Sequence, residues 1–331
     1  MKLFLTCILI FCSVIGMCQY KNVPGIEFIK SADRASGFVD YAKALNRQDP
    51  DFDSARYYYE KGSRVFLEDQ NEEQFTEAAT KYAWTYAYQY QHAASAAFLD
   101  SIFDHYSETV LKADTARINF YNQWAWGCLN GGRPYDAYQL YGKTIAYLDS
   151  IGITANFMVR NALQFRGISA RQYGMFDLAE IEYLKLLDIS QNVPYYKYGA
   201  LNSLAILARS QGDYNLAEKY YKDILLHQPS WQVLNNLAYL YIQMGKEEKA
   251  LGILDSVMVE VKQESGGKLG NLQSSMYSNM GEAYQAQKNY SDALYAYRMA
   301  VQADIATNSI LNQAHHELMI AKCFWESGTI D

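Results

Sequence analysis

The feature that most constrains the fold of this chain is a motif that occurs twice in its C-terminal half. The segment Gly212–Ala217, with Tyr221 four residues later, is echoed by Asn289–Ala293 with Tyr297 four residues later. Repetition of this kind is typical of helical units that stack into a solenoid. Because each unit buries its apolar face only against its neighbours, the array can form one elongated body, whatever domain count 331 residues suggest.

Around the first copy, apolar and small residues fall into two stripes at helical spacing on either side of Gly212, which lets the chain turn back. The stripes are Leu201, Leu204, Ala205 and Ala208, then Tyr214, Ala217, Tyr221 and Ile224. Two antiparallel helices approach closely only where both lack bulk, so Ala205 and Ala217 are expected at the contact, with Tyr221 filling the gap beside them.

This spacing resembles the tetratricopeptide repeat, in which a small residue is followed by a turn, an alanine twelve positions on, and an aromatic residue four positions later. Five units fit the pattern, at Ala125 and Ala137, Gly167 and Ala179, Ala205 and Ala217, Ala238 and Ala250, and Gly281 and Ala293. The resemblance covers about Arg117 to Asp304. It implies an all-α protein, a right-handed α-solenoid of antiparallel helix pairs, of the exported bacterial type.

The pattern departs from the family in two ways. A final proline is present only at Pro229, and two of the intervals between repeats are longer than usual. One of the long intervals contains Ser265–Lys268, which is expected to be an exposed loop after a lengthened helix. We therefore divide the chain into a signal peptide at 1–18, divergent helical repeats at 19–110, and a repeat array at 111–331 that ends in a capping helix.

Outside the five clear units, helices are predicted from weaker patterns. Ala35–Asn46 and Ser54–Phe66 form one expected pair, and Glu73–Val110 is expected to hold another. The run Tyr82–Tyr88 alternates aromatic and small residues, yet no turn residue bounds it, so a helix is favoured over a strand. His315–Trp325 matches the first helix of a sixth repeat and is interpreted as the end cap that repeat arrays require.

The N-terminus predicts export. Met1 and Lys2 precede an apolar run that ends in Gly16–Cys18, as in a secretory signal peptide, so the mature chain is expected to begin near Gln19. A lipid anchor at Cys18 is the less favoured alternative, because Met17 is too large for the residue that precedes a lipid-modified cysteine. No later segment reaches the roughly 20 apolar residues that a membrane span needs. The chain is expected to be periplasmic or secreted, with envelope association as an option.

Charge and motif spacing argue against several functions. A net charge of −7 with scattered basic residues is not the footprint of a nucleic-acid-binding protein. No catalytic, metal or cofactor site is predicted, and the pair His315–His316 lacks a second histidine one turn on and is interpreted as a solvated pair. Cys128 and Cys323 are expected to be buried apolar side chains without a disulfide between them.

In the family that this chain resembles, the first helix of each pair lines a concave groove, which implies a binding face for an extended peptide. The residues predicted to line it are Asn119, Asn122, Trp126, Asn161, Gln164, Arg171, Asn202, Arg209, Gln232, Asn235, Tyr239, Gln243, Ser278, Glu282 and Gln285. A ladder of carboxamides can pair with successive peptide groups, because each offers a donor and an acceptor. Arg171 and Arg209, at equivalent places, could anchor a carboxylate.

The favoured function is a non-enzymatic protein-interaction scaffold of the cell envelope. The carboxamides fit equally well with a face that is merely kept soluble. Two alternatives remain beside the scaffold: the periplasmic sensory region of a membrane signalling protein, such as a kinase or transcriptional regulator, and a glycan-binding envelope protein in which Trp126, Tyr239 and Trp325 stack on sugar rings.

Overall fold

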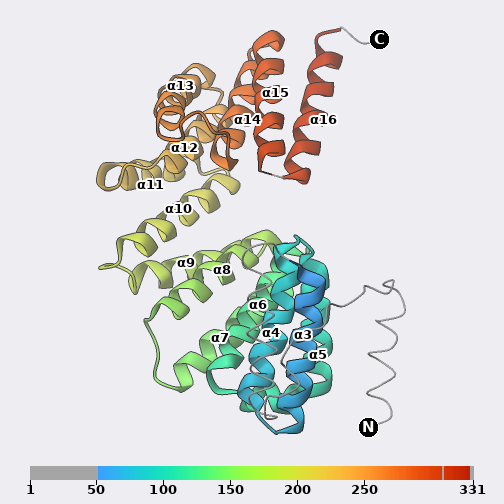
Figure 1. Cartoon of the computed structure of the whole chain (residues 1–331). Helices are drawn as coiled ribbons and strands as arrows, with labels where there is room; N and C mark the ends of the chain where they lie inside the picture. Colours follow the sequence, from blue (N-terminus) through green and yellow to red (C-terminus); the bar gives the residue numbers. More distant parts are fainter. Residues whose placement is uncertain (1–50, 308, 329–331) are drawn as a thin grey trace. The chain divides into compact units, whose positions relative to one another are not determined.

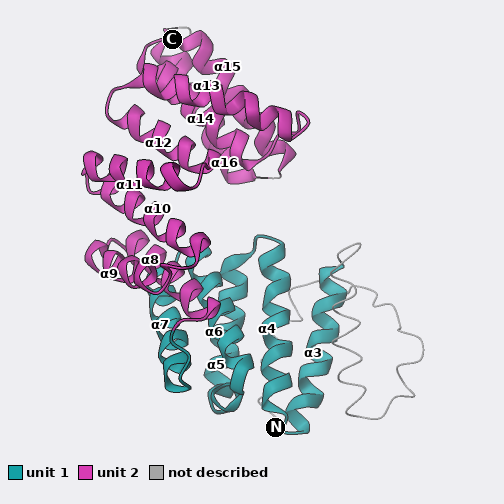
Figure 2. Ribbon diagram, turned by 90° about the vertical axis from the view of Figure 1, so that its left-hand side faces the viewer, with its two compact units in different colours: residues 1–154 teal, residues 155–331 magenta. Residues whose placement is uncertain are grey.

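The computed structural model describes residues 51–307 and 309–328, which form fourteen α-helices and no strand (Figure 1). Their helices group into two compact units, Met1–Thr154 (unit 1) and Ala155–Asp331 (unit 2), which are coloured separately in Figure 2. The predicted change from divergent to regular repeats at 110/111 does not coincide with this division.

Unit 1 is a stack of antiparallel helices in which each contacts the next along the chain, and in which α4 also contacts α6. Its helices are α3 (Phe52–Glu68), α4 (Glu72–Tyr88), α5 (His92–Lys112), α6 (Asp114–Asn130) and α7 (Pro134–Ser150). The helices α4 and α6 are the first members of two helical pairs, with α5 and α7 as their partners.

Unit 2 continues the same alternation. Its helices are α8 (Phe157–Tyr173), α9 (Phe176–Asp188), α10 (Pro194–Ser210), α11 (Tyr214–His227), α12 (Trp231–Gln243), α13 (Glu247–Glu264), α14 (Asn271–Ala286), α15 (Tyr290–Ala306) and α16 (Ile310–Glu326). The first helices of its pairs are α8, α10, α12 and α14, and α16 packs on α15 as the first helix of a further pair.

Short turns separate the helices, and side-chain caps mark where several of them begin. Asn156, Asp213, Ser230 and Asn289 each accept a hydrogen bond from the backbone N–H three residues on, which satisfies a donor that the helix itself leaves unpaired. Gly174 ends α8 in the left-handed conformation, and Gly212 adopts the same conformation (φ 82°) between α10 and α11. An L side chain rarely adopts this geometry, so glycine allows the sharp reversal.

The small residues lie where the sequence predicts. All five pairs of small residues are buried, and the aromatic residue four positions after the second member is buried in four of them, with Leu254 taking that place in the fourth. The glycines are packed most tightly: a methyl group on Gly167 would lie 2.4 Å from Cε1 of Tyr183, and one on Gly281 would lie 2.6 Å from Cε1 of Tyr297. The predicted repeat register is confirmed.

The divergent N-terminal segment has the same register. Ala83 in α4 and Ser95 in α5 are twelve positions apart and fully buried, and Leu99 takes the place of the aromatic residue. The segment Tyr82–Tyr88 is helical, and Ser54–Phe66 lies within α3, as predicted. The expected helix Ala35–Asn46, the signal peptide and Cys18 lie outside the described residues.

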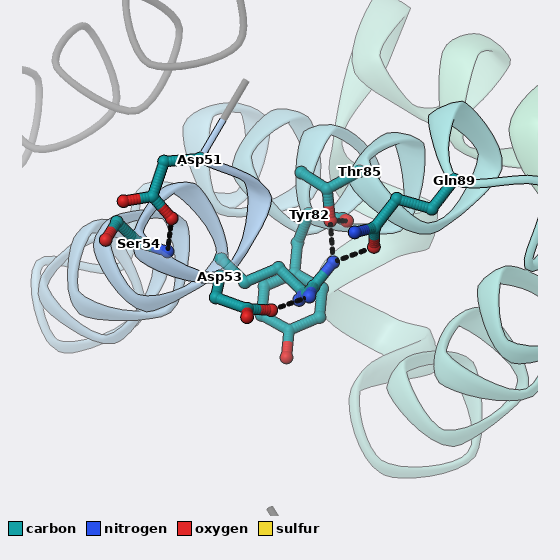
Figure 3. Close-up of polar contacts among 7 residues, drawn as sticks. Asp51, Asp53, Ser54, Tyr82, Thr85 and Gln89 are labelled. Atoms are coloured by element: carbon teal, nitrogen blue, oxygen red, sulfur yellow. Dashed lines mark hydrogen bonds and ion pairs between the residues drawn. The ribbon is translucent and has the colours of Figure 1, made fainter. Parts of the chain in front are cut away.

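Polar contacts fasten α3 to α4 (Figure 3). Asp51 caps α3 through the backbone N–H of Ser54, at 3.0 Å. The Arg56 guanidinium donates to Oγ1 of Thr85 at 3.2 Å and to Oε1 of Gln89 at 2.9 Å, and also pairs with Asp53. These bonds leave the charge of Arg56 compensated within unit 1.

The structure also agrees with the sequence-based predictions for the loops and cysteines described below. Ser265–Lys268 is a loop after the long helix α13, and the other long interval is filled by the connection between α7 and α8. Cys128 and Cys323 are buried thiols, and burial raises the pKa of Cys128 to about 12. Across residues 51–307 and 309–328, no helix combines the length and apolar character that a membrane crossing requires.

Candidate functional site

The candidate site of unit 2 is the surface formed by the polar side chains of its first helices, α8, α10, α12, α14 and α16. We call it the first-helix face. The helices α8, α10, α12 and α14 each present their smallest residue to their own partner helix, so the side chains three before, one after and four after that residue lie on the adjoining surface. The face therefore follows from the same register that builds the core.

The carboxamides on this face are used largely to join neighbouring repeats. Asn236 of α12 donates from Nδ2 to Oδ1 of Asn202 on α10, at 3.0 Å. One repeat further, Asn279 of α14 donates from Nδ2 to Oδ1 of Asn235 on α12, at 2.9 Å. Each bond joins consecutive first helices, which fixes their stacking.

The prediction that Asn235 lines an open groove is wrong. Its side chain is only 4% exposed, because Asn279 and the neighbouring helix cover it. Asn202 is half-buried and uses its oxygen in the bond to Asn236, so its amide N–H groups are what it can offer to a partner. The carboxamides therefore do not form one continuous exposed ladder.

The two arginines occupy equivalent environments. Arg171 lies near the buried hydroxyl of Tyr183. Burial raises the pKa of this tyrosine, and the positive charge of Arg171 opposes the rise. Arg209 is related to Tyr221 in the same way. Burial raises the pKa of Tyr221 to about 12, and the charge of Arg209 opposes the rise. The Arg209 guanidinium also lies over the Tyr239 ring, with its carbon 4.5 Å from the ring centroid. The contact holds Arg209 in place without neutralising its charge.

A cluster of opposite charges continues from Arg209 toward the end of the array. Burial raises the pKa of the Glu282 carboxyl on α14, and the nearby His315, Lys322 and Arg209 oppose that rise. Side chains of α10, α14 and α16 therefore interact electrostatically at this end of the face, and Lys322 is also paired with Glu326 at 3.7 Å.

Gln285 lies next to this cluster and bridges two residues. It donates from Nε2 to Oε2 of Glu326 on α16, at 2.7 Å, and accepts at Oε1 from the Tyr297 hydroxyl, at 3.1 Å. Because both ends of its carboxamide are engaged, Gln285 positions α16 and is poorly placed to bind a peptide.

The other predicted residues of unit 2 lie at different depths. Gln232 and Gln243 are exposed at the two ends of α12, while Tyr239, Gln164 and Ser278 are half-buried. Asn161 accepts at Oδ1 from the Tyr196 hydroxyl at 3.0 Å, which joins α8 to α10. Gln232 and Gln243 are thus the predicted carboxamides most open to solvent in this unit.

The three predicted residues of unit 1 all lie on α6. Asn119 is exposed, and Asn122 accepts from the hydroxyl of Thr144 on α7 at 3.3 Å. Trp126 is half-buried and contacts His92 of α5 edge to face, with ring centroids 6.4 Å apart.

The interpretation of His315 and His316 as a solvated pair is half wrong. His315 is exposed, but His316 is buried and bonds through Nδ1 to Oδ2 of Asp304, at 2.6 Å. Oδ1 of the same carboxylate accepts from the Ser274 hydroxyl at 2.6 Å. The three side chains come from α14, α15 and α16, and their hydrogen bonds link these helices.

This serine, aspartate and histidine do not have the order of a hydrolase triad. A nucleophilic serine needs the imidazole beside its hydroxyl, with the carboxylate behind the ring. Here the Asp304 carboxylate lies between Ser274 and His316. Among the residues that the structure describes, no group of three or more histidine, cysteine, aspartate or glutamate side chains is placed to bind a metal.

Sequence reasoning missed three sets of residues. Asn236 and Asn279 were detectable, since each holds a carboxamide at the position two before the small residue of its repeat. The exposed aromatics of α4 were hidden by the divergence of that repeat, although Trp84 follows Ala83 as Trp126 follows Ala125. No local signal marks Asp304 as the partner of His316.

Comparison with known protein families identifies the repeat. Two family models, each described as the tetratricopeptide repeat, match residues 199–226 and 232–306. A search of curated protein sequences finds no match.

Solved structures share the fold over most of the chain. The crystal structure of a tetratricopeptide repeat protein from Parabacteroides merdae ATCC 43184 is similar with a TM-score of 0.66 and 16% identity, over 86% of this chain and 98% of that one. The apo form of RapI is similar with a TM-score of 0.56 and 15% identity, over 83% of this chain and 98% of that one. At such identities the likeness concerns the fold alone.

Proposed function

Because the chain is a tetratricopeptide repeat protein, we propose that it is a non-enzymatic scaffold that holds an extended peptide segment of a partner protein on the first-helix face of unit 2. The tetratricopeptide repeat fold is in general that of a protein-interaction scaffold without catalytic activity. The proposal adds to this the kind of ligand, an extended peptide, and the face on which it binds.

The observation that carries this proposal is the pair of equivalent arginines. Arg171 and Arg209 are half-buried on consecutive first helices, and each is positioned by tyrosine side chains of the core. A guanidinium that is already positioned loses little conformational freedom when it binds a carboxylate, and it can do so with two parallel hydrogen bonds. The partner segment is therefore expected to contain acidic groups.

The neighbouring residues suit the same ligand. Tyr239 supports Arg209, and the half-buried Asn202 has its oxygen engaged by Asn236, so it can donate to a peptide carbonyl. Lys322 on α16 lies beyond Glu282 but is paired with Glu326, so Arg171 and Arg209 carry the positive charge of this face. An acidic extended segment would meet donors and positive charge on the consecutive first helices α8 and α10.

We place this scaffold in the cell envelope on the sequence of residues 1–18. Export predicts that the mature chain begins at Gln19. N-terminal sequencing of the protein from its native cell tests this, and an intact Met1 in the cytoplasm would contradict it.

The binding proposal is tested by capture of partners from an envelope extract with the full mature chain. The test variant is Arg171→Gln/Arg209→Gln, and the control Lys219→Gln/Arg298→Gln removes the same charge from exposed positions on the second helices α11 and α15. Mass spectrometry is expected to find a partner that binds the wild type and the control but not the test variant.

Two further readouts support the interpretation of that result. Thermal unfolding must show that the test variant is folded, and binding of the partner should weaken as salt is added, because screening acts on exposed charges. Equal capture by all three proteins would overturn the assignment of the site to this face.

A further inference from the structure

The helix α16, which lies beside α15 in unit 2 (Figure 1), has an apolar surface that the proposed function does not use. Leu311 is 86% exposed, Leu318 66% and Trp325 72%. Two exposed alanines, Ala314 and Ala321, lie between them. We call these residues the α16 stripe. A helix that caps a repeat array keeps it soluble by turning a polar outer side to water, and the α16 stripe does not do this.

The α16 stripe lies on the side of the helix opposite to its buried side. His316 bonds to Asp304 and Cys323 packs with Tyr297, so both buried residues of α16 face α15. Each residue turns about 100° around a helix, so positions two before and two after a buried residue lie on the far side. From Ala314 onward, each residue of the stripe is two positions from His316 or Cys323. The helix is therefore apolar on two opposite sides, and one of them is covered.

The repeat register shows what kind of neighbour the uncovered side would accept. Ala321 lies five residues before the end of α16, as Ala205 and Ala238 do in α10 and α12, and a glycine with positive φ follows each of them seven residues later. Ala205 and Ala238 are 0% exposed, because the second helix of their own pair packs on them. Ala321 is exposed. The side that carries the stripe is thus shaped for the close approach of another helix.

The spacing of the stripe allows that helix to be a copy of α16 itself. From Leu311 to Trp325 its residues follow one another at intervals of three, four, three and four. This is the repeat of the contact positions in a two-stranded coiled coil. Two copies would therefore match layer by layer, with leucine and tryptophan layers separated by alanine layers where the backbones come close.

The charges beside the stripe select a second copy in parallel orientation. Glu317 lies on one flank of the stripe and Lys322, five residues later, lies on the other. In a parallel two-stranded pair, residues at these two positions face each other across the helices and form ion pairs. Glu317 of each copy would therefore face Lys322 of the other.

Both charges are available for such a pair. Within the described part of the chain, Glu317 has no basic partner and accepts from Nε2 of Gln313 at 2.8 Å. Lys322 lies 3.7 Å from the Glu326 carboxylate, in a solvent-exposed contact that holds it weakly.

The helix that carries the stripe is fixed before a second copy arrives. The Asp304 carboxylate holds both His316 and the Ser274 hydroxyl at 2.6 Å, and Gln285 donates to Glu326 at 2.7 Å. These bonds join α16 to α14 and α15. Little conformational freedom is then lost when α16 associates.

We propose that α16 pairs in parallel with α16 of a second copy of the chain through the α16 stripe, with Glu317 of each copy facing Lys322 of the other. This pairing is independent of the peptide segment proposed above, whose anchors Arg171 and Arg209 belong to α8 and α10. The dimer would carry two peptide-binding faces.

The first test is the oligomeric state of the full mature chain, measured by analytical ultracentrifugation over a range of concentrations. The wild type is expected to dimerise. Leu311→Gln/Leu318→Gln should raise the dissociation constant by at least about tenfold, because it removes two apolar layers of the pair. The control Leu226→Gln/Val259→Gln replaces exposed apolar residues of α11 and α13 and should dimerise as the wild type does.

The second test changes the charges and keeps the stripe. Glu317→Lys and Lys322→Glu each place like charges across the pair, so each variant alone should dimerise about two- to tenfold more weakly than the wild type. An equimolar mixture of the two variants should regain the loss, because opposite charges then face each other in the mixed dimer. A variant that failed to fold could not give this recovery.

Three results would overturn the proposal. The first is a wild type that stays monomeric up to about 1 mM. The second is a dimer that Leu311→Gln/Leu318→Gln does not weaken, or a mixture of the two charge variants that associates no better than either alone. The third is a monomeric wild type that binds a helix of a different protein through the stripe, which would make the occupant that protein.

Discussion

Units 1 and 2 share the packing of the repeat core and differ in the side chains that their first helices expose. In unit 1, Ala125 and Ala137 bring α6 and α7 together and Tyr141 fills the space beside them; in unit 2, Ala205, Ala217 and Tyr221 do the same for α10 and α11. The first helices then present inclined aromatic rings in unit 1 and positioned arginines in unit 2. The comparison teaches that the repeat fixes how helices pack, while the adjoining positions are free to specify a ligand.

The shared core gives the largest expected effect. Tyr141→Ala and Tyr221→Ala each empty a buried ring site, so each should lower the free energy of unfolding of its unit by about 3–5 kcal/mol. Chemical denaturation followed by circular dichroism measures the loss. A cost below about 1 kcal/mol for either variant would break the equivalence of the two cores.

One aspartate in each unit joins neighbouring helices, and the two differ in how deeply they are buried. Asp304→Ala leaves Ser274 and His316 without their common partner inside unit 2, and is expected to cost about 3–5 kcal/mol. In unit 1, Asp100 accepts from Nε1 of Trp124 and pairs with Arg133 nearer to solvent, so Asp100→Ala should cost about 1–2 kcal/mol. Thermal unfolding of both variants that gave the reverse order would contradict the role of the buried cluster.

Close packing of glycine against tyrosine is expected to give an intermediate effect. Gly281→Ala places a methyl group against the Tyr297 ring and should destabilise unit 2 by about 1–3 kcal/mol. Gly252→Ala, within α13 and with open space around it, is the matched control and should stabilise by up to about 1 kcal/mol. Equal melting temperatures for the two variants would show that the repeat register is misplaced at this pair.

The smallest effect concerns the charged cluster around Glu282 in unit 2. Burial raises the pKa of Glu282 in the folded state, so the folded protein holds this proton more tightly than the unfolded chain. Its contribution to stability is present below the ordinary pKa of glutamate and is lost as the pH rises through the raised value. Glu282→Gln should therefore match the wild type in acid and melt slightly higher near neutral pH.

The melting temperatures of wild type and Glu282→Gln, measured across the acid to neutral range, test this expectation. Glu264→Gln, at an exposed position of α13, is the control and should follow the wild type at every pH. Parallel curves for wild type and Glu282→Gln would mean that Glu282 is as well solvated when folded as when unfolded.

Much of the fold was predictable because small residues at helix contacts have few substitutes. The pairs Gly167 with Ala179 and Gly281 with Ala293 identify the packing positions, since even a methyl group at either glycine would press against a tyrosine ring. The loop at Ser265–Lys268 and the helical state of Tyr82–Tyr88 followed from turn residues, or from their absence.

The candidate site was less predictable, because exposure depends on the neighbouring repeat. Asn202 and Asn235 hold equivalent positions, yet Asn235 is covered by α14 and Asn202 is only half-buried. The burial of His316 depends on Asp304, which belongs to another helix. Such contacts are set by the stacking of repeats and not by spacing within one repeat.

The central claim is that the first-helix face of unit 2 binds an acidic peptide segment through Arg171 and Arg209. The most direct measurement is selection of short peptides from a random library by the wild-type chain, by Arg171→Gln/Arg209→Gln and by the control Lys219→Gln/Arg298→Gln. The wild type and the control are expected to select acidic peptides that the folded arginine variant does not select. Selection of the same acidic peptides by all three proteins would contradict the account.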